Sequence, residues 1–515
     1  MRKLIEPIFG DYDEKVFYPV VGLLALAMVV IFINADAFKA FFDAINNWLI
    51  FNFSWGFLIG VGAAVFFAIW LGMSKYGDMR LGKDTDRPEF SFIAWVAMMF
   101  SAGFGLSTLL WCAAEPLYHL YQSSWTIDAG TAGTPAGIPR AMVLTWLDWG
   151  IHGWALFAIG GLAIAFPAYR MGKPMTLGIG LFGILKEKSI TGFWGKLADV
   201  LGVISTLGGN SASLGFGVLS IAYGIKYITG IELGSAGTLV AMAMIIVAFI
   251  CSAVSGVEKG IKYLSLINIY IGIGMLIYLL IVGPTGYLFS LITQTFGDYV
   301  SQVVTLSFWT DAANFKDGAW EQRSWLNWWV IFYWLWWVSY IPFCSGFIAR
   351  ISRGRTIREY ILGTTIVPVL MTFILFGVWG GNAAYLEVTG AAPIWDAVQN
   401  DFGSTIYTLL SQFPAGKVLC VVVFFSIVCF GVTTSDSAAY FISMQVSKGN
   451  PNPTIAMRIL WGVALGSVGL LLLASGKLNA IKAMAIVVGA PFFFVMIGYM
   501  VSIVKMLRMA SRGEL

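Results

Sequence analysis

Tryptophan is concentrated in one apolar segment of this chain. Six of the 21 tryptophans lie between residues 325 and 337, and Trp336, Trp337 and Tyr340 stand about three turns beyond its start. On a helix, residues three and four apart share a face, so Tyr340 lies beside both tryptophans. Aromatic faces bind cations that cannot donate hydrogen bonds, at about 0.5–2 kcal/mol per ring. The earlier tryptophans fit a belt at a membrane interface instead: Trp325, Trp328 and Trp329.

A second aromatic group, Trp149, Trp154 and Phe157, surrounds Gly150 and Gly153 in another apolar stretch. Glycine tolerates unusual backbone conformations, so we expect a local distortion of the helix here. If the two aromatic faces meet, three or four rings hold a quaternary ammonium at about 1 μM without a counter-charge. The competing interpretation for any single ring is ordinary packing.

Two apolar stretches are interrupted by small and polar residues. The first carries Gly103 and Gly105 within 101–107, and the second carries Thr433, Thr434 and Asp436 within 431–437. Hydroxyls and unwound backbone are ligands for sodium inside a membrane, which favours a cation site. Small residues also let helices approach closely. Asp436 is either part of the site or the partner of a buried polar group.

The composition predicts the elements that must hold these residues. Hydrophobic residues make up 58% of the 515 residues and charged ones 11%, against about 25% in soluble domains. Because lipid offers no hydrogen-bond partners, long apolar runs must be helices, so we predict an all-α polytopic membrane protein. Twelve runs are expected: 17–34, 52–74, 92–118, 138–166, 198–226, 235–254, 263–283, 325–349, 360–381, 416–446, 456–474 and 483–507.

The arrangement of these runs predicts orientation and internal symmetry. Most of the 31 basic residues fall in loops on one side, which indicates a multi-pass protein of the cell (inner) membrane with cytoplasmic termini. The interrupted runs occupy the first and third positions of two five-helix blocks, which we interpret as inverted repeats over 90–283 and 325–507. Between them, 284–322 is expected to form an amphipathic surface helix and a loop. The net charge of +4 gives no reason to expect a nucleic-acid partner.

Several motifs together resemble the betaine-choline-carnitine transporter family. They are WWVSYIPF at 336–343 with ARISRGRTIRE at 349–359, AGFG at 102–105, AEPL at 114–117, DWGIHGWA at 148–155 and TSDSA at 434–438. The resemblance covers the whole spanning region. It implies a twelve-span carrier with a LeuT-like fold, membrane-embedded and homotrimeric, with no cofactor other than sodium as the coupling ion.

The resemblance also implies roles for individual residues. Trp149, Trp154, Phe157 and Trp337 match an ammonium cage. Trp336 and Tyr340 match neighbours that line the path to it. The other candidate substrate-binding residues are Gly103, Phe104, Gly105, Ser107 and Asp148, of which Ser107 departs from the family's usual glycine and either bonds a substrate carboxylate or packs. One sodium site is implied by Ser101, Phe104, Phe430, Thr433 and Thr434, and a second by Thr206, Asn210 and Phe343. No catalytic residue and no other metal are implied.

Departures from the family pattern bear on the cargo. Phe157 stands for a Tyr, Tyr340 for a Trp and Asn210 for a Thr, while the Arg of sodium-independent exchangers is here Asn268. Asp148 replaces a His: facing the site it favours a cation such as choline, and facing a neighbouring helix it pairs with a polar group.

The sequence thus predicts a sodium-coupled importer of a glycine betaine-type zwitterion. The alternatives are a carrier for choline, dimethylsulfoniopropionate or taurine, and an exchanger of the carnitine type. An intramembrane enzyme would need a metal set or a nucleophile with its base, but the chain has only His119, expected at the interface, and His152, expected to orient a cage residue. A channel would need a polar-lined pore or charged rings, and neither is visible.

Overall fold

The computed structural model describes residues 2–103, 108–232, 234–255, 258–310, 312, 324–474 and 478–514. Within these ranges the chain is helical, and the only β pairing is an isolated bridge between Arg80 and Thr356. The long helices are α2 (Glu14–Ile33), α3 (Ala35–Met73), α4 (Phe92–Gly103), α5 (Thr108–Gln122), α7 (Ile138–Trp149), α8 (Ile151–Met171), α11 (Phe193–Thr229), α12 (Gly234–Ser255), α13 (Glu258–Val282), α14 (Thr285–Ser307), α16 (Phe332–Ile351), α17 (Ile357–Val388), α20 (Gly416–Val446), α21 (Ile455–Ala474) and α22 (Leu478–Ser511).

Shorter helices connect the long ones. They are α1 (Arg2–Phe9), α6 (Ser124–Ile127), α9 (Phe182–Leu185), α10 (Lys188–Thr191), α15 (Ser324–Leu326), α18 (Ile394–Asn400) and α19 (Thr405–Leu410), with 3₁₀ turns at Pro135–Gly137, Gly178–Leu181 and Phe402–Ser404. A π-helical turn, Asn327–Ile331, leads into α16.

Each of the twelve expected apolar runs falls on one of these helices or on two consecutive ones. Among the described residues, eight helices are long and apolar enough to cross a membrane, or nine if α13 and α14, bent by 108°, form one broken span. Two shorter apolar helices, Ala236–Ser252 and Ile455–Leu470, fall below that length. The protein is therefore all-helical and polytopic, as the composition predicted.

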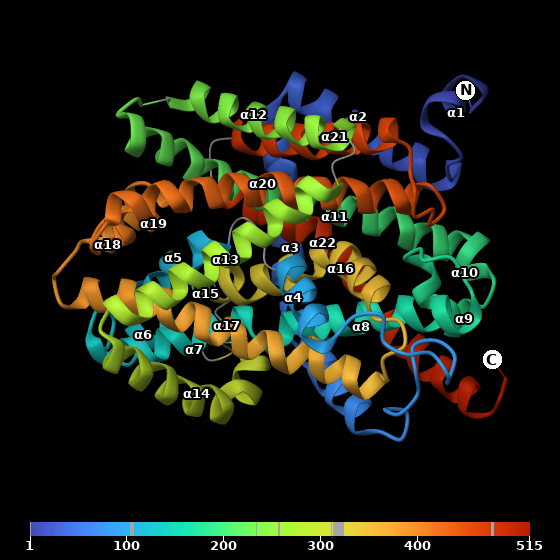
Figure 1. Ribbon diagram of the computed structural model, residues 1–515, viewed down its shortest axis with the longest axis horizontal. Coiled ribbons are helices and arrows are strands. Elements are labelled where there is room, and N and C mark those ends of the chain that lie inside the picture. The colour runs from blue at the N-terminus through green and yellow to red at the C-terminus, as the bar shows by residue number, and fades with distance from the viewer. Residues whose placement is uncertain are drawn as a thin grey trace.

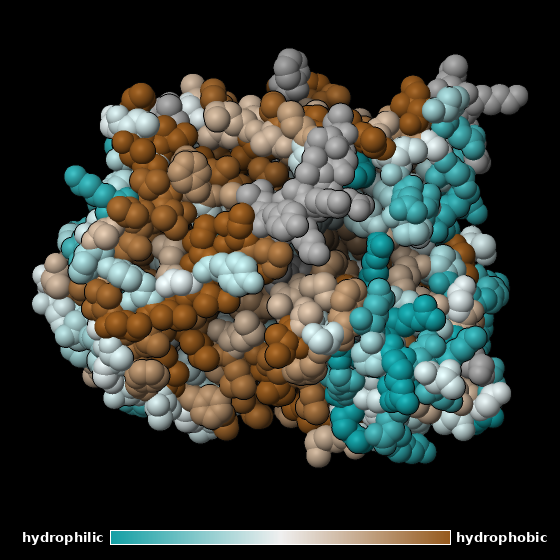
Figure 2. All heavy atoms as spheres, viewed as in Figure 1, coloured by the Kyte–Doolittle hydropathy of each residue, from teal (hydrophilic) through white to brown (hydrophobic). Residues whose placement is uncertain are grey.

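Apolar side chains form a broad band across the surface (Figure 2). The band lies between a strongly hydrophilic end near α9 and α10 and a paler, mixed end, and α12, α17 and α20 run from one end toward the other (Figure 1). Exposed residues of these helices and of α13 include Val240, Met244, Val247, Ile273, Ile277, Ile366, Leu370, Ile374 and Phe425. Such a belt is what hydrocarbon requires of a protein surface.

The helices are interrupted or distorted at two places where the sequence contains unusual residues. The chain breaks between α7 and α8 at Gly150, whose backbone lies outside the helical region (φ −90°, ψ −136°). A Cβ there would lie 2.2 Å from the carbonyl oxygen of Trp146, so only glycine fits. The π-helical turn before α16 is the second irregularity.

α16 is the central helix around which these elements pack. It contacts α8, α11, α20 and α22, and nearly all its side chains are buried. Small residues allow the close approach: a Cβ on Gly489 of α22 would lie 2.3 Å from the carbonyl oxygen of Leu335. Close backbone contact through small residues is the usual basis of helix packing in membranes.

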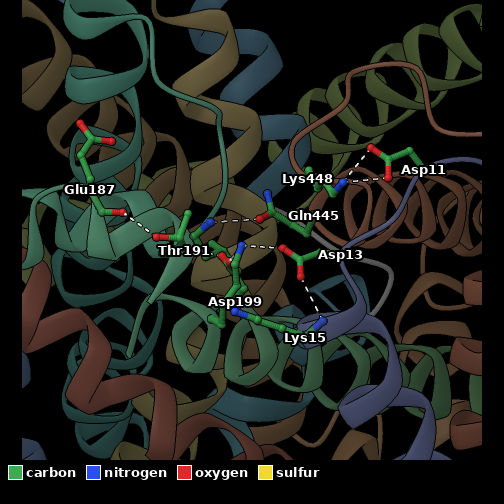
Figure 3. A network of polar contacts seen from close by, with 11 residues as sticks. Asp11, Asp13, Lys15, Glu187, Thr191, Asp199, Gln445 and Lys448 are labelled. Carbon is green, nitrogen blue, oxygen red and sulfur yellow. Dashed lines mark hydrogen bonds and ion pairs between the residues drawn. The ribbon is translucent and has the colours of Figure 1, made fainter. Parts of the chain in front are cut away.

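The segment before α2 is tied to the hydrophilic end by ionic contacts (Figure 3). Lys448 contacts both carboxylate oxygens of Asp11 at 2.8 Å. Lys196 lies 2.6 Å from Asp13 and 3.5 Å from Asp199, whose other oxygen accepts the Gly178 amide at 2.7 Å. The network holds the N-terminal segment against α11 and α20, on the same side of the view as the C-terminus (Figure 1).

Candidate functional site

The aromatic rings singled out in the sequence converge on Trp337 of α16. Its ring centroid lies 5.8 Å from Trp149 of α7, and 6.0 Å and 5.0 Å from Trp154 and Phe157 of α8. Trp154 and Phe157 meet edge to face at 5.8 Å and 86°. The distorted helix pair and the tryptophan-rich segment therefore form one aromatic cluster, which we call the cage.

A cavity of about 30 Å³ lies among the cage rings. Its lining residues are Gly103, Thr108, Trp149, Phe157, Ser213, Trp336, Trp337 and Tyr340. Trp336 lies 6.1 Å from Trp149 and meets Tyr340 edge to face at 6.2 Å. Because the space is comparable with that of about one water molecule, the cage is contracted, and a methylated head must push the rings apart to enter.

Two of the rings rest directly on glycine. A Cβ on Gly153 would lie 2.3 Å from the Trp337 ring, and one on Gly103 would lie 2.5 Å from the Trp154 ring. Real Cβ atoms almost never come within 3.0 Å of a neighbour. The glycines of the two motifs therefore make room for the rings.

Three tryptophans that line the cavity donate their indole N–H groups away from it. Trp149 donates to Oε2 of Glu115 at 2.6 Å, and Trp337 donates to the carbonyl oxygen of Asp148 at 2.8 Å. Trp336 donates to the carbonyl oxygen of Gly209 at 3.4 Å. These bonds fix the ring orientations and leave the π surfaces as the groups that meet a ligand.

Behind Trp149, three ionisable side chains meet in the core. Nε2 of His119 lies 3.3 Å from Oε1 of Glu115 and 3.3 Å from Oδ2 of Asp148, and all three residues are fully buried. Their ligand-type atoms lie within 4.8 Å of one another. The expectation of an interfacial His119 is therefore wrong, because α7 and two tryptophans that precede α16, Trp325 and Trp329, cover the end of α5. Asp148 points into this group and does not line the cavity.

A buried lysine adds a positive charge to this group. Lys482 is 4% exposed, and its Nζ lies 4.0 Å from the ring centroid of Trp329 and 4.9 Å from that of Phe332. It also donates to the carbonyl oxygen of Trp328 at 3.1 Å.

Trp325 and Trp329 are only 8% and 4% exposed, so they are core residues and not part of an interface belt.

Comparison with known proteins assigns a family to this arrangement. The sequence model described as BCCT, betaine/carnitine/choline family transporter, matches residues 15–512. The glycine betaine transporter OpuD of Bacillus subtilis is 34% identical over 97% of this chain and 95% of its own length. The chain belongs to the BCCT family. It is therefore a multi-pass membrane transporter and not an enzyme.

Other BCCT relatives differ in the solute that they are named for. The glycine betaine transporter of Acinetobacter baylyi is 30% identical over 98% of this chain and 74% of its own length. The high-affinity choline transport protein of Escherichia coli is 30% identical over 96% of this chain and 72% of its own length. Similarity alone thus points to betaine- and choline-type compounds without choosing between them.

The residues that the BCCT resemblance links to sodium lie on α11, α16 and α20, which pack together. Thr206 donates to the Gly202 carbonyl at 2.9 Å, and Asn210 donates to the Thr206 carbonyl at 3.0 Å. Within the described residues, Oδ1 of Asn210 is buried without a hydrogen-bond donor. Phe343, predicted for the same site, lies on the adjacent face of α16 and is 5% exposed.

The predicted site on α20 is only partly visible. Thr433 donates to the carbonyl oxygens of Cys429 and Phe430 at 2.9 and 3.3 Å, and Thr434 is half-buried. Two other predicted ligands of this site precede α5. Phe104 lies outside the described residues, as do Gly105 and Ser107, and only the backbone of Ser101 is described.

Two further polar residues of the spans have structural partners. Asp436 accepts a hydrogen bond from Arg458 of α21 at 2.9 Å, which accounts for this buried carboxylate without a ligand. Asn268 of α13 donates to the Ser426 carbonyl at 3.2 Å. His152 stacks on Trp334 at 4.4 Å and bonds Ser307 at 2.7 Å, so it contacts a ring next to the cage rather than a cage ring.

Sequence reasoning missed four residues of this region: Thr108, Ser213, Glu115 and Lys482. Thr108 and Ser213 bring hydroxyl groups to the cavity lining. Glu115 is a charged residue within an apolar run and Lys482 lies directly before one, and such charges are costly in a membrane. Their charge alone was a usable signal, because such residues mark functional pathways by default.

Proposed function

We propose that this BCCT transporter imports a small quaternary-ammonium solute of the glycine betaine type by sodium symport. The observation that carries the proposal is the convergence of Trp149, Phe157 and Trp337 on one cavity, with Trp154 packed against Trp337 and with the indole donors of Trp149 and Trp337 bonded elsewhere. A trimethylammonium head has no N–H to donate and is bound by such π faces at about 0.5–2 kcal/mol per ring.

The proposed transport mechanism depends on the broken helices that carry the cage. In this proposal the twelve apolar stretches all span the membrane in a LeuT-like fold, with inverted repeats over 90–283 and 325–507 and α14 at a surface. The break at Gly150 supports it, since discontinuous helices at mid-membrane form the binding sites of such carriers. Rocking of one bundle against the other would open the contracted cage.

The proposal of sodium coupling depends on two sets of candidate oxygen ligands and on the neutral Asn268, which stands where sodium-independent exchangers carry an Arg. The proposed ligands are Ser101, Phe104, Phe430, Thr433 and Thr434 at one site, and Thr206, Asn210 and Phe343 at the other. Oδ1 of Asn210 is a buried acceptor available to a cation, and the neutral Asn268 contacts Ser426 where an exchanger would carry an Arg.

The membrane placement is part of the proposal. Cytoplasmic termini follow from the basic residues at the hydrophilic end, among them Arg350, Arg353 and Arg358 of the α16–α17 connection. The exposed apolar band supports burial in the inner membrane, and a homotrimer is proposed on the family resemblance alone.

Choline is the second candidate cargo, favoured by the buried carboxylates. Glu115 contacts the cage ring of Trp149, and Asp148 stands beside His119. Negative charge so close to the cage attracts a net cation more strongly than a zwitterion.

Uptake into proteoliposomes tests the proposal. Labelled glycine betaine and choline are offered with an inward sodium gradient, and again with potassium replacing sodium. We expect saturable uptake that requires sodium and is lost in Trp337→Leu. Uptake that is unchanged in potassium would contradict symport, and no uptake of either solute would contradict the cargo.

A further inference from the structure

Sodium-coupled import of glycine betaine, as proposed above, gives no role to the ionisable group behind the cage. Glu115 and His119 come from α5, Asp148 from α7 and Lys482 from α22, and none is more than 4% exposed. Each is costly to bury in a membrane, so a set of four in one place calls for a physical explanation.

The geometry leaves room for one exchangeable proton. Both carboxylates interact electrostatically with a single lysine, Lys482, so with a charged Lys482 and a neutral His119 one negative charge is unbalanced. His119 Nε2 stands 3.3 Å from an oxygen of each carboxylate, which is where a shared proton would restore balance. Among the described residues, neither oxygen of Asp148 has a hydrogen-bond donor.

Two residues of the group, Glu115 and Asp148, connect it to the cage. Glu115 accepts the indole hydrogen of Trp149 at 2.6 Å, and the Asp148 backbone accepts that of Trp337 at 2.8 Å. One indole ring therefore separates Glu115 from the cavity. At this separation in a low-dielectric interior, a cation in the cavity and a proton on the group repel each other.

We propose that Glu115, His119 and Asp148 form a proton-binding site that competes with the cationic head in the cage, so that binding of the cation releases a proton to solvent. The inference rests on the proposed cage function. The other titratable groups facing the site are Lys482 of α22, Tyr333 of α16 and Cys112 of α5. Binding linkage is reciprocal: if the cation expels the proton, affinity for the cation rises with pH.

The test uses the full-length protein in nanodiscs with choline chloride and glycine betaine. Tryptophan fluorescence reports cage occupancy, and a pH-indicator dye in weakly buffered solution reports protons. We expect release of up to about one proton per bound choline and about tenfold tighter choline binding across the titration. Glycine betaine, a zwitterion, is expected to release fewer protons.

Variants separate the proton site from a carboxylate elsewhere in the fold. Asp148→Asn is expected to abolish proton release and flatten the pH dependence of choline affinity. Glu115→Gln keeps an oxygen for Trp149 and is expected to do the same, should Asp148→Asn fold poorly. Asp401→Asn, a carboxylate that caps a 3₁₀ turn between α18 and α19, serves as the matched control and is expected to behave like the wild type.

The outcomes distinguish this inference from the function beneath it. Choline that changes the fluorescence without proton release, or with proton uptake, would overturn the proton site and leave the cage intact. Release that persists in both Asp148→Asn and Glu115→Gln would also overturn it. No fluorescence change with either solute would instead count against the proposed cage.

Discussion

Gly153→Ala tests whether the position of one ring sets the affinity. The added methyl group would lie 2.3, 2.4 and 2.7 Å from three atoms of the Trp337 ring. Ordinary contact begins at about 3.5 Å, so the ring must move by about 1 Å. The Trp337 ring contacts each of the other three cage rings, and its indole N–H donates to the Asp148 carbonyl oxygen at 2.8 Å. Movement of this ring therefore disturbs the whole cage.

The expected loss follows from one ring. Removing a cation–π contact worth about 0.5–2 kcal/mol weakens binding about 2- to 30-fold, since about 1.4 kcal/mol corresponds to a factor of ten. Binding of labelled glycine betaine by scintillation proximity measures it. The matched control is Gly274→Ala on α13, where an added methyl meets nothing within 4 Å, and it is expected to bind as the wild type does.

A double variant separates crowding from other effects. In a Trp337→Phe background the smaller ring leaves room, so Gly153→Ala should cost less there than in the wild type. Wild-type affinity in Gly153→Ala, or an equal loss in Gly274→Ala, would refute the reasoning.

Three further outcomes are expected. Asn210→Ala should raise the sodium concentration for half-maximal uptake with little change at saturating sodium, and an unchanged sodium dependence would argue against this ligand. Thr356→Ala removes the hydroxyl that accepts the Glu359 amide at the start of α17, and should cost about 1 kcal/mol, measured as a lower melting temperature. Asp199→Ala leaves the buried Gly178 amide unpaired and should cost about 1–3 kcal/mol, more than Lys448→Ala at the exposed ion pair; the reverse order in thermal unfolding would contradict the network.

The aromatic cage could be predicted because residue type carried the information. Tryptophan is distinctive, and its i, i+3 and i+4 spacing with Tyr340 places rings on one helix face. The glycines next to Trp149 and Trp154 indicated the distortion that the structure places at Gly150. That α7, α8 and α16 would meet came only from the family resemblance, since no local pattern links residues 189 positions apart.

The ionisable group was missed because it depends on contacts among distant helices. His119 ends an apolar run, a position typical of an interface, yet α7 and the residues Trp325 and Trp329 before α16 cover it. The same applies to Asp148, whose two open interpretations could be separated only by knowing which helix it faces. Hydropathy likewise registers an apolar run as continuous across 138–166, where the structure has two helices, α7 and α8.

The central claim is that the cage recognises positive charge through π faces. Choline and its uncharged carbon isostere, 3,3-dimethylbutan-1-ol, have nearly the same shape and differ in the quaternary centre. With at least three rings contributing, choline should bind at least about tenfold tighter, in the wild type and also in Asp148→Asn, where the nearby carboxylate is neutral. Equal affinity for the two compounds would show that the pocket selects shape alone and would contradict the account.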